Sequence, residues 1–165
     1  MRKLSDVFKS NSGYQMFFLS MITFGLSYGL YKGIIDNYLA EIVSLTSFDK
    51  GVSEFFREMP GLMLVFILAA FYMFSAEKIY KIGSLIMMIG MAMQAVVPAT
   101  RMMVILAIFV YSLGDHIQLG MRNTLSLQYA KDGHGGAALG LQNAVYQIGT
   151  LAGYLVIIAV FFFLN

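Results

Sequence analysis

The chain has 165 residues, of which 59% are hydrophobic and only 12% are charged, and its mean hydropathy is +0.74. An average soluble domain carries about 25% charged residues, so this composition excludes a soluble globular class and indicates an integral membrane protein. The formal net charge of +2 is too small to predict a nucleic-acid partner, and the absence of cysteine excludes disulfides and thiolate metal sites.

Residues 1–13 form a short polar segment that contains Arg2, Lys3 and Lys9. A basic start followed by an apolar run is the outline of a secretory signal, but no small-residue cleavage site follows, and the helical pattern continues well past a signal's length. We therefore predict a cytoplasmic amino-terminal segment and a retained first membrane helix over residues 14–43. Residues 14–164 would form the transmembrane bundle.

The first helix carries Gly25, Gly29 and Gly33 at strict four-residue spacing, a stripe that allows another helix to approach closely. Lys32 and Asp36 lie one turn apart in the same helix. They form either an internal ion pair or a cavity wall with a fixed cation and a fixed anion, and the residues alone leave both readings open.

The second predicted helix covers residues 51–74. Arg57 and Glu58 lie roughly two turns inside it, where a buried pair with the first helix is favoured over surface exposure. Pro60 would kink the helix because it cannot donate a backbone hydrogen bond. A third helix over residues 79–97 has no charge after Lys81, and its methionines are interpreted as flexible apolar filler, not as a metal site.

The fourth predicted helix, residues 102–129, places Asp115 and His116 near the middle of an apolar segment that is long enough to span a bilayer. An ionisable side chain at that depth costs roughly 2.5–3.5 kcal/mol unless it faces the bundle interior, a partner or water. Tyr111, Asp115, Gln118 and Arg122 share one helical face. We expect that polar stripe to face an interior cavity.

A glycine-rich connection over residues 130–136 lacks the Gly-Lys-Ser/Thr ending of a phosphate-binding loop. The fifth predicted helix, residues 137–164, contains Gly149 and Gly153, which repeat the four-residue spacing of small residues. The only histidines, His116 and His134, have no companions at ligand spacing, so we predict no metal and no cofactor.

The basic residues at the helix ends predict an orientation in the cell membrane (plasma or inner membrane). With a cytoplasmic amino terminus, one side of the membrane would receive Arg2, Lys3, Lys9, Lys78, Lys81 and Lys131. The other side would receive Lys50 and Arg101. This asymmetry satisfies the positive-inside rule, and five helices then place the carboxyl end of the chain outside.

Four segments together resemble the amino-terminal portion of the major facilitator superfamily of secondary transporters. They are Gly33-Ile-Ile-Asp-Asn-Tyr38, Glu54-Phe-Phe-Arg-Glu-Met-Pro-Gly61, the short basic loop before the third helix, and Gly136-Ala-Ala-Leu-Gly-Leu141. The resemblance implies an all-α membrane fold and alternating access, in which two bundles rock around a midplane site. In that family the first and fourth helices line the central cavity.

The chain also departs from the family pattern. The loop signature Gly-x-x-x-Asp-Arg-x-Gly-Arg/Lys retains its acidic and basic places, at Glu77, Lys78 and Lys81, but has Met73 and Tyr80 where the family has glycines. The Gly-Pro pair of many proton-driven exporters is missing from the fifth helix. Family members have twelve helices, so a five-helix chain lacks the sixth helix and the second half. It is expected to be a fragment, or a short chain that assembles with a second subunit.

The resulting hypothesis is gradient-coupled transport of a small polar or charged solute, with protons or Na⁺ as candidate coupling ions. Asp115 and His116, with Gln118 on the polar stripe, would bind substrate or proton. Arg122 and Lys32 would hold anionic groups or neutralise Asp115 and Asp36. The alternative is a non-transporting membrane subunit or scaffold whose helices pack against a partner.

An enzyme is not predicted. Asp115 and His116 are sequence neighbours and so point about 100° apart on a helix, which argues against a direct acid/base pair. No nucleophile is paired with them.

Overall fold

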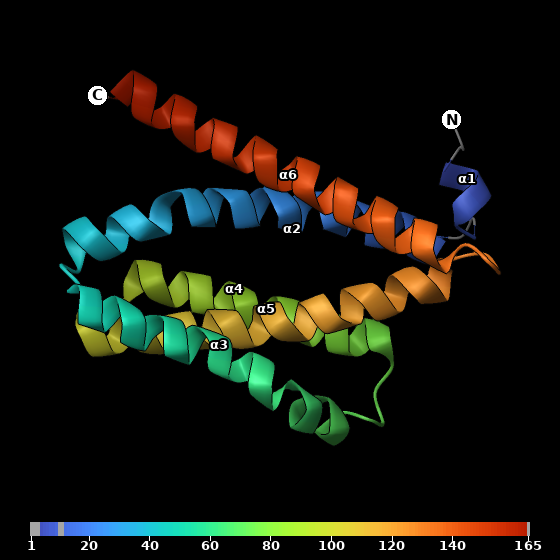
Figure 1. The fold of residues 1–165 in the computed structure, drawn as a ribbon, viewed down its shortest axis with the longest axis horizontal. Coiled ribbons are helices and arrows are strands. Elements are labelled where there is room, and N and C mark those ends of the chain that lie inside the picture. Colours follow the sequence, from blue (N-terminus) through green and yellow to red (C-terminus); the bar gives the residue numbers. More distant parts are fainter. Residues whose placement is uncertain (1–3, 10–11, 165) are drawn as a thin grey trace. The chain divides into compact units, whose positions relative to one another are not determined.

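The computed structural model describes residues 4–9 and 12–164, which form helices joined by short connections (Figure 1). The five long helices predicted from the apolar runs are present. They are α2 (Ser12–Asn37), α3 (Ser47–Ala70), α4 (Ala76–Val96), α5 (Arg101–Tyr129) and α6 (Gly135–Leu164). A four-residue helix, α1 (Leu4–Val7), precedes them, and one turn of π-helix, η1 (Tyr38–Ile42), extends α2. Arg2 and Lys3 of the predicted basic terminus lie outside the described residues.

Four of these segments are long and apolar enough to cross a membrane: Ser12–Ile42, α4, α5 and α6. The membrane class expected from composition is therefore supported by helices of spanning length. The expectation of five spanning helices is met by four, because five charged residues lie in the first half of α3. These are Asp49, Lys50, Glu54, Arg57 and Glu58.

The second predicted helix is shifted along the sequence, since α3 begins at Ser47 instead of 51 and ends at Ala70 instead of 74. Its start is fixed by a capping box, in which the Asp49 amide donates to Thr46 Oγ1 at 3.2 Å and the Thr46 amide donates to Asp49 Oδ2 at 3.0 Å. Asp49 Oδ1 also pairs with Arg101 Nη1 at 3.1 Å. This ion pair joins the first turn of α3 to the first turn of α5.

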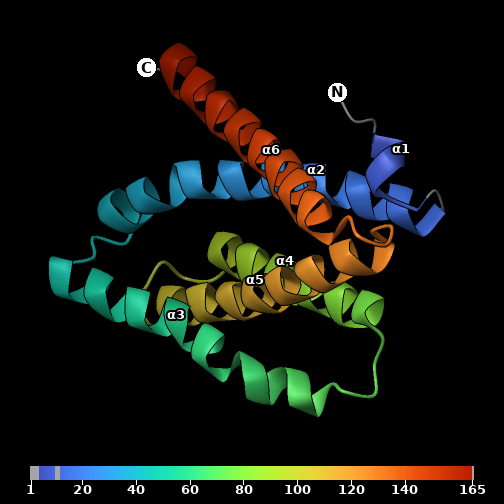
Figure 2. The ribbon, with the colours of Figure 1, turned by 45° about the vertical axis from the view of Figure 1, so that its right-hand side comes forward.

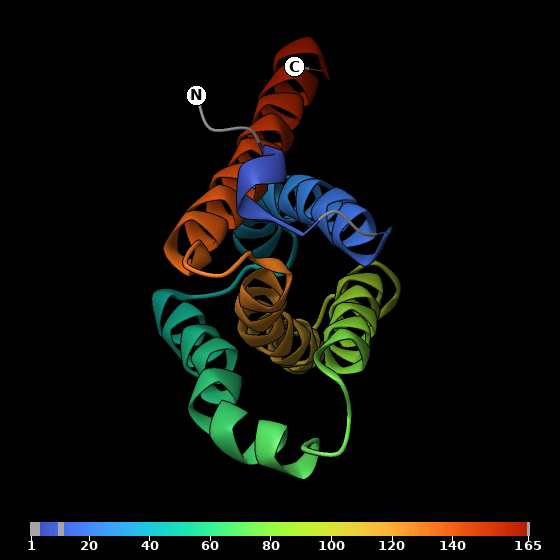
Figure 3. The same ribbon diagram turned by 90° about the vertical axis from the view of Figure 1, so that its right-hand side faces the viewer.

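The chain divides into two compact units. Unit 1 comprises the described residues up to Tyr38 together with 126–164, and its main contact joins α2 to α6 (Figure 2). Unit 2 comprises residues 39–125 and contains α3, α4 and most of α5. Figure 3 shows α5 lying between α3 and α4.

In unit 1, α2 and α6 run parallel and meet through glycines. A Cβ added at Gly25 would lie 3.3 Å from Gly149 Cα, and one added at Gly29 would lie 3.1 Å from Gly153 Cα. One added at Gly33 would lie 3.0 Å from the Ile157 side chain. The two glycine stripes expected to pack against another helix thus face each other within one chain.

The amino-terminal segment of unit 1 is more ordered than a polar start predicts. Phe8 is only 2% exposed and stacks on Tyr14 with ring centroids 4.6 Å apart. The Lys9 amide donates to Tyr129 O, and the Lys131 amide donates to Val7 O, both at 2.9 Å. These bonds attach residues 7–9 to the connection between α5 and α6.

In unit 2, α4 and α5 form an antiparallel pair, because Gly90 packs on Tyr111 while Gly83 packs on Gly114 and Gln118. A Cβ added at Gly83 would lie 3.0 Å from the Gln118 amide nitrogen and 3.1 Å from Gly114 O. Since α3 and α5 start at the same end, Lys78 and Lys81 at the start of α4 lie at the opposite end from Lys50 and Arg101.

Candidate functional site

The contact between α3 and α5 in unit 2 brings together charged and polar side chains near the centre of α5. Asp115 is the central residue of this 29-residue helix, and His116 follows it. The Ser112 hydroxyl donates a short hydrogen bond to the carbonyl oxygen of Arg57 on α3. Gly120, one turn beyond His116, continues the contact, because a Cβ added at Gly120 would lie 3.7 Å from the Leu64 side chain. The two helices therefore run parallel, with Ser112, His116 and Gly120 facing α3.

The imidazole of His116 is oriented by its own helix. Nδ1 lies 2.9 Å from Ser112 O and 3.1 Å from Ser112 Oγ. A carbonyl oxygen only accepts hydrogen bonds, so Nδ1 carries a hydrogen in this arrangement. Nε2 points toward α3 and lies 3.8 Å from Glu58 Oε2.

A glycine on α3 provides the space for this ring. A Cβ added at Gly61 would lie 2.8 Å from His116 Nε2 and 2.9 Å from its Cδ2. Contacts under 3.0 Å essentially do not occur for real Cβ atoms, so any larger residue at 61 must displace the imidazole. Gly61 and Ser112 together determine where His116 sits.

On the α3 side, Arg57 bridges two carboxylates. Its Nη2 lies 2.5 Å from Glu54 Oε2, and its Nε lies 3.1 Å from Glu58 Oε1. The side chains of Arg57, Glu54 and Glu58 are 33%, 53% and 62% exposed. Arg57 and Glu58, expected to form a buried pair with the first helix, pair with each other within α3, and Arg57 also pairs with Glu54.

Part of the predicted polar stripe of α5 faces α4, because Gly90 packs on Tyr111 and Gly83 packs on Gln118. Ser112 and His116 face α3, whereas Gly114 and Ile117 face α4. The stripe comprises Tyr111, Asp115, Gln118 and Arg122, and all of these except the half-buried Asp115 are buried. The Gln118 side chain is 1% exposed, and its Nε2 finds no hydrogen-bond partner among the described residues.

Lys32 and Asp36 belong to unit 1 and are not part of the α3–α5 contact. Lys32 is half-buried near the end of α2, and Asp36 is exposed. Within residues 4–9 and 12–164, no ion pair joins these two side chains. The internal ion pair, one of the two readings of this motif, is therefore not formed.

Sequence reasoning missed the structural roles of Glu54, Gly61 and Ser112. Glu54 neutralises Arg57, one helical turn further along α3. Ser112 lies one helical turn before His116, and that spacing is the signal that a serine can hold a histidine ring. Gly61 follows Glu58 by three residues, so the sequence shows a small residue about one helical turn from the carboxylate. The sequence does not show that His116 on α5 packs against that glycine.

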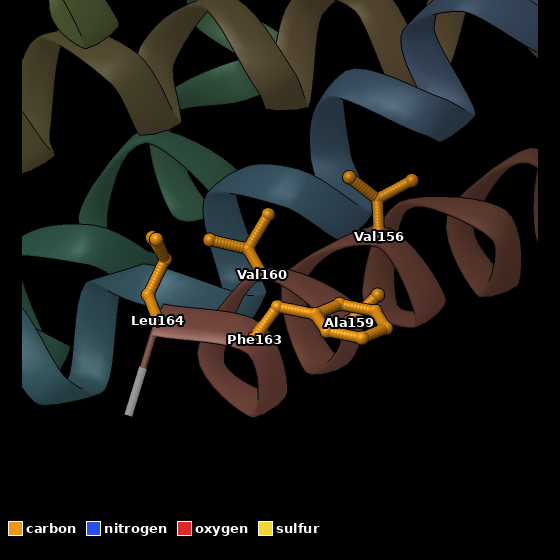
Figure 4. A pocket seen from close by; sticks show the side chains of 5 residues that line it. All are labelled: Val156, Ala159, Val160, Phe163 and Leu164. Atoms are coloured by element: carbon orange, nitrogen blue, oxygen red, sulfur yellow. The ribbon is translucent and has the colours of Figure 1, made fainter.

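The described residues include no group of three or more His, Asp or Glu side chains placed to hold a metal ion. A hollow of about 390 Å³ lies on the second half of α6 (Figure 4). Its lining is apolar: Val156, Ala159, Val160, Phe163 and Leu164. It offers nothing to orient a polar solute and is separate from the α3–α5 contact.

Comparison with known proteins identifies no relative: no family model matches the chain, and neither does any curated protein or solved structure. The resemblance to the major facilitator superfamily gains no support from them.

Proposed function

We propose that this chain takes part in membrane transport of a small polar or charged solute, coupled to an ion gradient. The observation that supports this most is the contact between His116 and Glu58 at the centre of α5. With α5 crossing a bilayer, this contact holds the charged side chains of α3 at the depth of the membrane interior.

Exposed charges at that depth need water or a polar partner. Placing one charged side chain in hydrocarbon costs about 2.5–3.5 kcal/mol even on insertion scales, and Glu54 and Glu58 are both more than half exposed. A water-filled path along this face of α3 removes that penalty. Such a path is what the passage of a polar solute requires.

In this proposal Asp115 and His116 bind the solute or the coupling ion, and Gln118 and Arg122 extend the polar surface along α5. The proposed mechanism is alternating access of the kind found in the major facilitator superfamily. The proposed location is the plasma or inner membrane, with the amino terminus in the cytoplasm.

The test is charge movement by purified full-length protein in vesicles of phosphatidylcholine and phosphatidylglycerol. Concentration jumps of defined probes, namely carboxylates, amino acids, sugars and nucleosides, are applied to wild-type protein. We expect at least one class to produce a transient current. Absence of current with every class would contradict transport by this chain.

The alternative, a non-transporting subunit, is separated from transport by labelling. The chain has no cysteine, so Glu54→Cys provides a single reactive site on the charged half of α3. Leu62→Cys is the matched control, since Leu62 is 79% exposed on the apolar half of the same helix. A membrane-impermeant thiol reagent should modify position 54 in native membranes and spare position 62. Protection of position 54 by a bound protein would favour the subunit.

The glycine stripes do not support the subunit alternative. It relied on helices that present glycine faces to a partner, and the structure uses Gly25 and Gly29 against Gly149 and Gly153 within unit 1. Gly33 packs against Ile157 in the same interface.

A further inference from the structure

We propose that His116 Nε2 and Glu58 Oε2 form a proton-binding site, and that the proton is the coupling ion of this chain. The coupling part rests on the proposed transport function, whereas the site itself does not. The contact lies wholly within unit 2, between Glu58, about three turns into α3, and the middle of α5.

The hydrogen bonds of Nδ1 determine which ring nitrogen of His116 is available to bind a proton. Nδ1 of His116 is held by Ser112 O at 2.9 Å, and the Ser112 hydroxyl hydrogen is used by Arg57 O. Nδ1 therefore keeps its hydrogen in both protonation states of the ring. The nitrogen that gains and loses a proton is Nε2, the one that faces Glu58.

The separation between His116 Nε2 and Glu58 Oε2 suits a proton and not a metal ion. The two atoms are 3.8 Å apart, too far for a direct hydrogen bond in the neutral form and close enough for an ion pair once Nε2 is protonated. Two ligand atoms do not make a metal site, and no third His, Asp or Glu joins them among the described residues. A proton needs only these two.

Arg57 and His116 both face the carboxylate of Glu58. Glu58 Oε1 accepts from Arg57 Nε at 3.1 Å, while Oε2 faces His116. Arg57 in turn is shared with Glu54 at 2.5 Å. When Nε2 carries a proton, Glu58 pairs with two cations, Arg57 and His116, and the α3–α5 contact is strengthened. When that proton is lost, Glu58 pairs with Arg57 but no longer with His116.

The other charged groups nearby are few. Asp115 is the neighbour of His116 on α5, but it projects from a different side of the helix. The helix α4 meets α5 through Gly114 and Ile117, away from the imidazole, and its charged residues Glu77, Lys78 and Lys81 lie at its first turns. Glu58 is thus the carboxylate that Nε2 faces.

The site can be tested without any solute. His134→Gln leaves His116 as the sole histidine, so its ring nitrogens can be observed by ¹⁵N NMR of the full chain in phosphatidylcholine and phosphatidylglycerol vesicles. We expect Nδ1 to be protonated in the neutral ring and Nε2 to gain its proton as the pH falls. A neutral ring with the hydrogen on Nε2 would overturn the assignment.

Glu58→Gln in the same background should lower the fraction of protonated Nε2 by about threefold at the pH where half of the wild-type rings carry that proton, because the carboxylate that faces the imidazolium is gone. Glu77→Gln is the control, since it removes one carboxylate from α4 of the same unit without touching the contact. An unchanged fraction in Glu58→Gln, or an equal fall in Glu77→Gln, would overturn the site.

The coupling role has its own readout. Solute-driven pH change inside vesicles, followed with the trapped dye pyranine, should be lost in Glu58→Gln while solute still crosses. Full proton coupling in that variant would overturn the role of the pair. If the wild type moves no solute, the transport proposal fails, and the NMR result still decides the proton site.

Discussion

The α2–α6 and α3–α5 contacts both join parallel helices, but they do so by opposite means. In unit 1, backbone meets backbone: a Cβ added at Gly153 would lie 2.5 Å from Leu26 O, and one at Gly149 would lie 2.7 Å from Ile22 O. In unit 2, side chains fill the space, with the His116 ring beside Gly61 and the Ser112 hydroxyl on Arg57 O.

The two helix contacts therefore differ in how far they can adjust. Backbone-to-backbone packing through glycines sets a single helix separation. A contact made by an imidazole, a hydroxyl and a carboxylate can change strength with protonation while both backbones stay in place. The two contacts thus predict that equivalent substitutions have different consequences.

The largest effect is expected from Gly29→Ala. The new methyl group would lie 2.9 Å from the Thr150 carbonyl carbon and 3.1 Å from Gly153 Cα, which are backbone atoms that cannot rotate away. The helices must separate, so we expect the free energy of unfolding to fall by ~3 kcal/mol or more. Unfolding of the detergent-solubilised protein by sodium dodecyl sulfate, followed by circular dichroism, measures it.

The control for that variant is Gly140→Ala in α6, where nothing lies within 4 Å of the added Cβ. Alanine is the better helix former there by about 0.5–1 kcal/mol, so this variant should be slightly more stable. Equal loss of stability in both variants would show that alanine is unfavourable at these helical glycines whether or not there is room for its methyl group, and would contradict the close-packing explanation.

Asp115→Asn should leave the fold intact and abolish gradient-coupled charge movement, because it neutralises the carboxylate at the centre of α5 without changing its size. The measurement is the transient current in vesicles, for whichever probe class moves in the wild type. Asp132→Asn, a substitution of the same chemistry in the exposed α5–α6 connection, should behave like wild type. Wild-type coupled currents in Asp115→Asn would remove Asp115 from the site.

Gly61→Ala repeats the Gly29→Ala substitution where the obstacle is a side chain. The methyl group meets His116 Nε2 at 2.8 Å, and an imidazole can turn where a backbone cannot. We expect a loss of only about 1 kcal/mol in unfolding free energy, accompanied by a changed ¹⁵N signal of His116 Nε2. Gly120→Ala on α5, whose Cβ would lie an ordinary 3.7 Å from Leu64, should alter neither the unfolding free energy nor the His116 signal. An undisturbed His116 signal in Gly61→Ala would contradict the conclusion that Gly61 provides the space for the His116 ring.

The sequence predicts the helices well and their pairing poorly, for a physical reason. An apolar run of spanning length has one stable form in a membrane, so α2, α4, α5 and α6 follow from composition alone. Glycine spacing shows that Gly25 and Gly29 permit a close approach, but the partner glycines Gly149 and Gly153 lie on a helix far along the chain. Nothing local selects that partner.

The same limit applies to the candidate site. Asp115 and His116 stand out because charge is rare in an apolar run, and this can be read from the sequence. That Nε2 meets Glu58 depends on the register between α3 and α5, which the Asp49–Arg101 ion pair and the Ser112–Arg57 bond fix only in the folded chain. That Arg57 pairs with both Glu54 and Glu58 within α3 likewise depends on side-chain conformations that the sequence does not specify.

The smallest effect is expected at the ion pair that sets this register. The hydrogen bond from the Thr46 hydroxyl lowers the pKa of Asp49 below the ordinary aspartate range, the Thr46 amide and Arg101 act in the same direction, and burial opposes them. A carboxyl with a lowered folded pKa adds stability that is fully present above the ordinary value of about 3.9 and is lost as the pH falls through the lowered one. The free energy of unfolding of wild-type protein should therefore exceed that of Asp49→Asn at neutral pH, and this difference should shrink as the solution is acidified below about pH 4. Unfolding of both proteins across that range measures the effect, with Asp132→Asn as the control that should show no such convergence. A difference that stays constant with pH would mean that Asp49 acts through its shape as a helix cap, and that its charge does not hold α3 to α5.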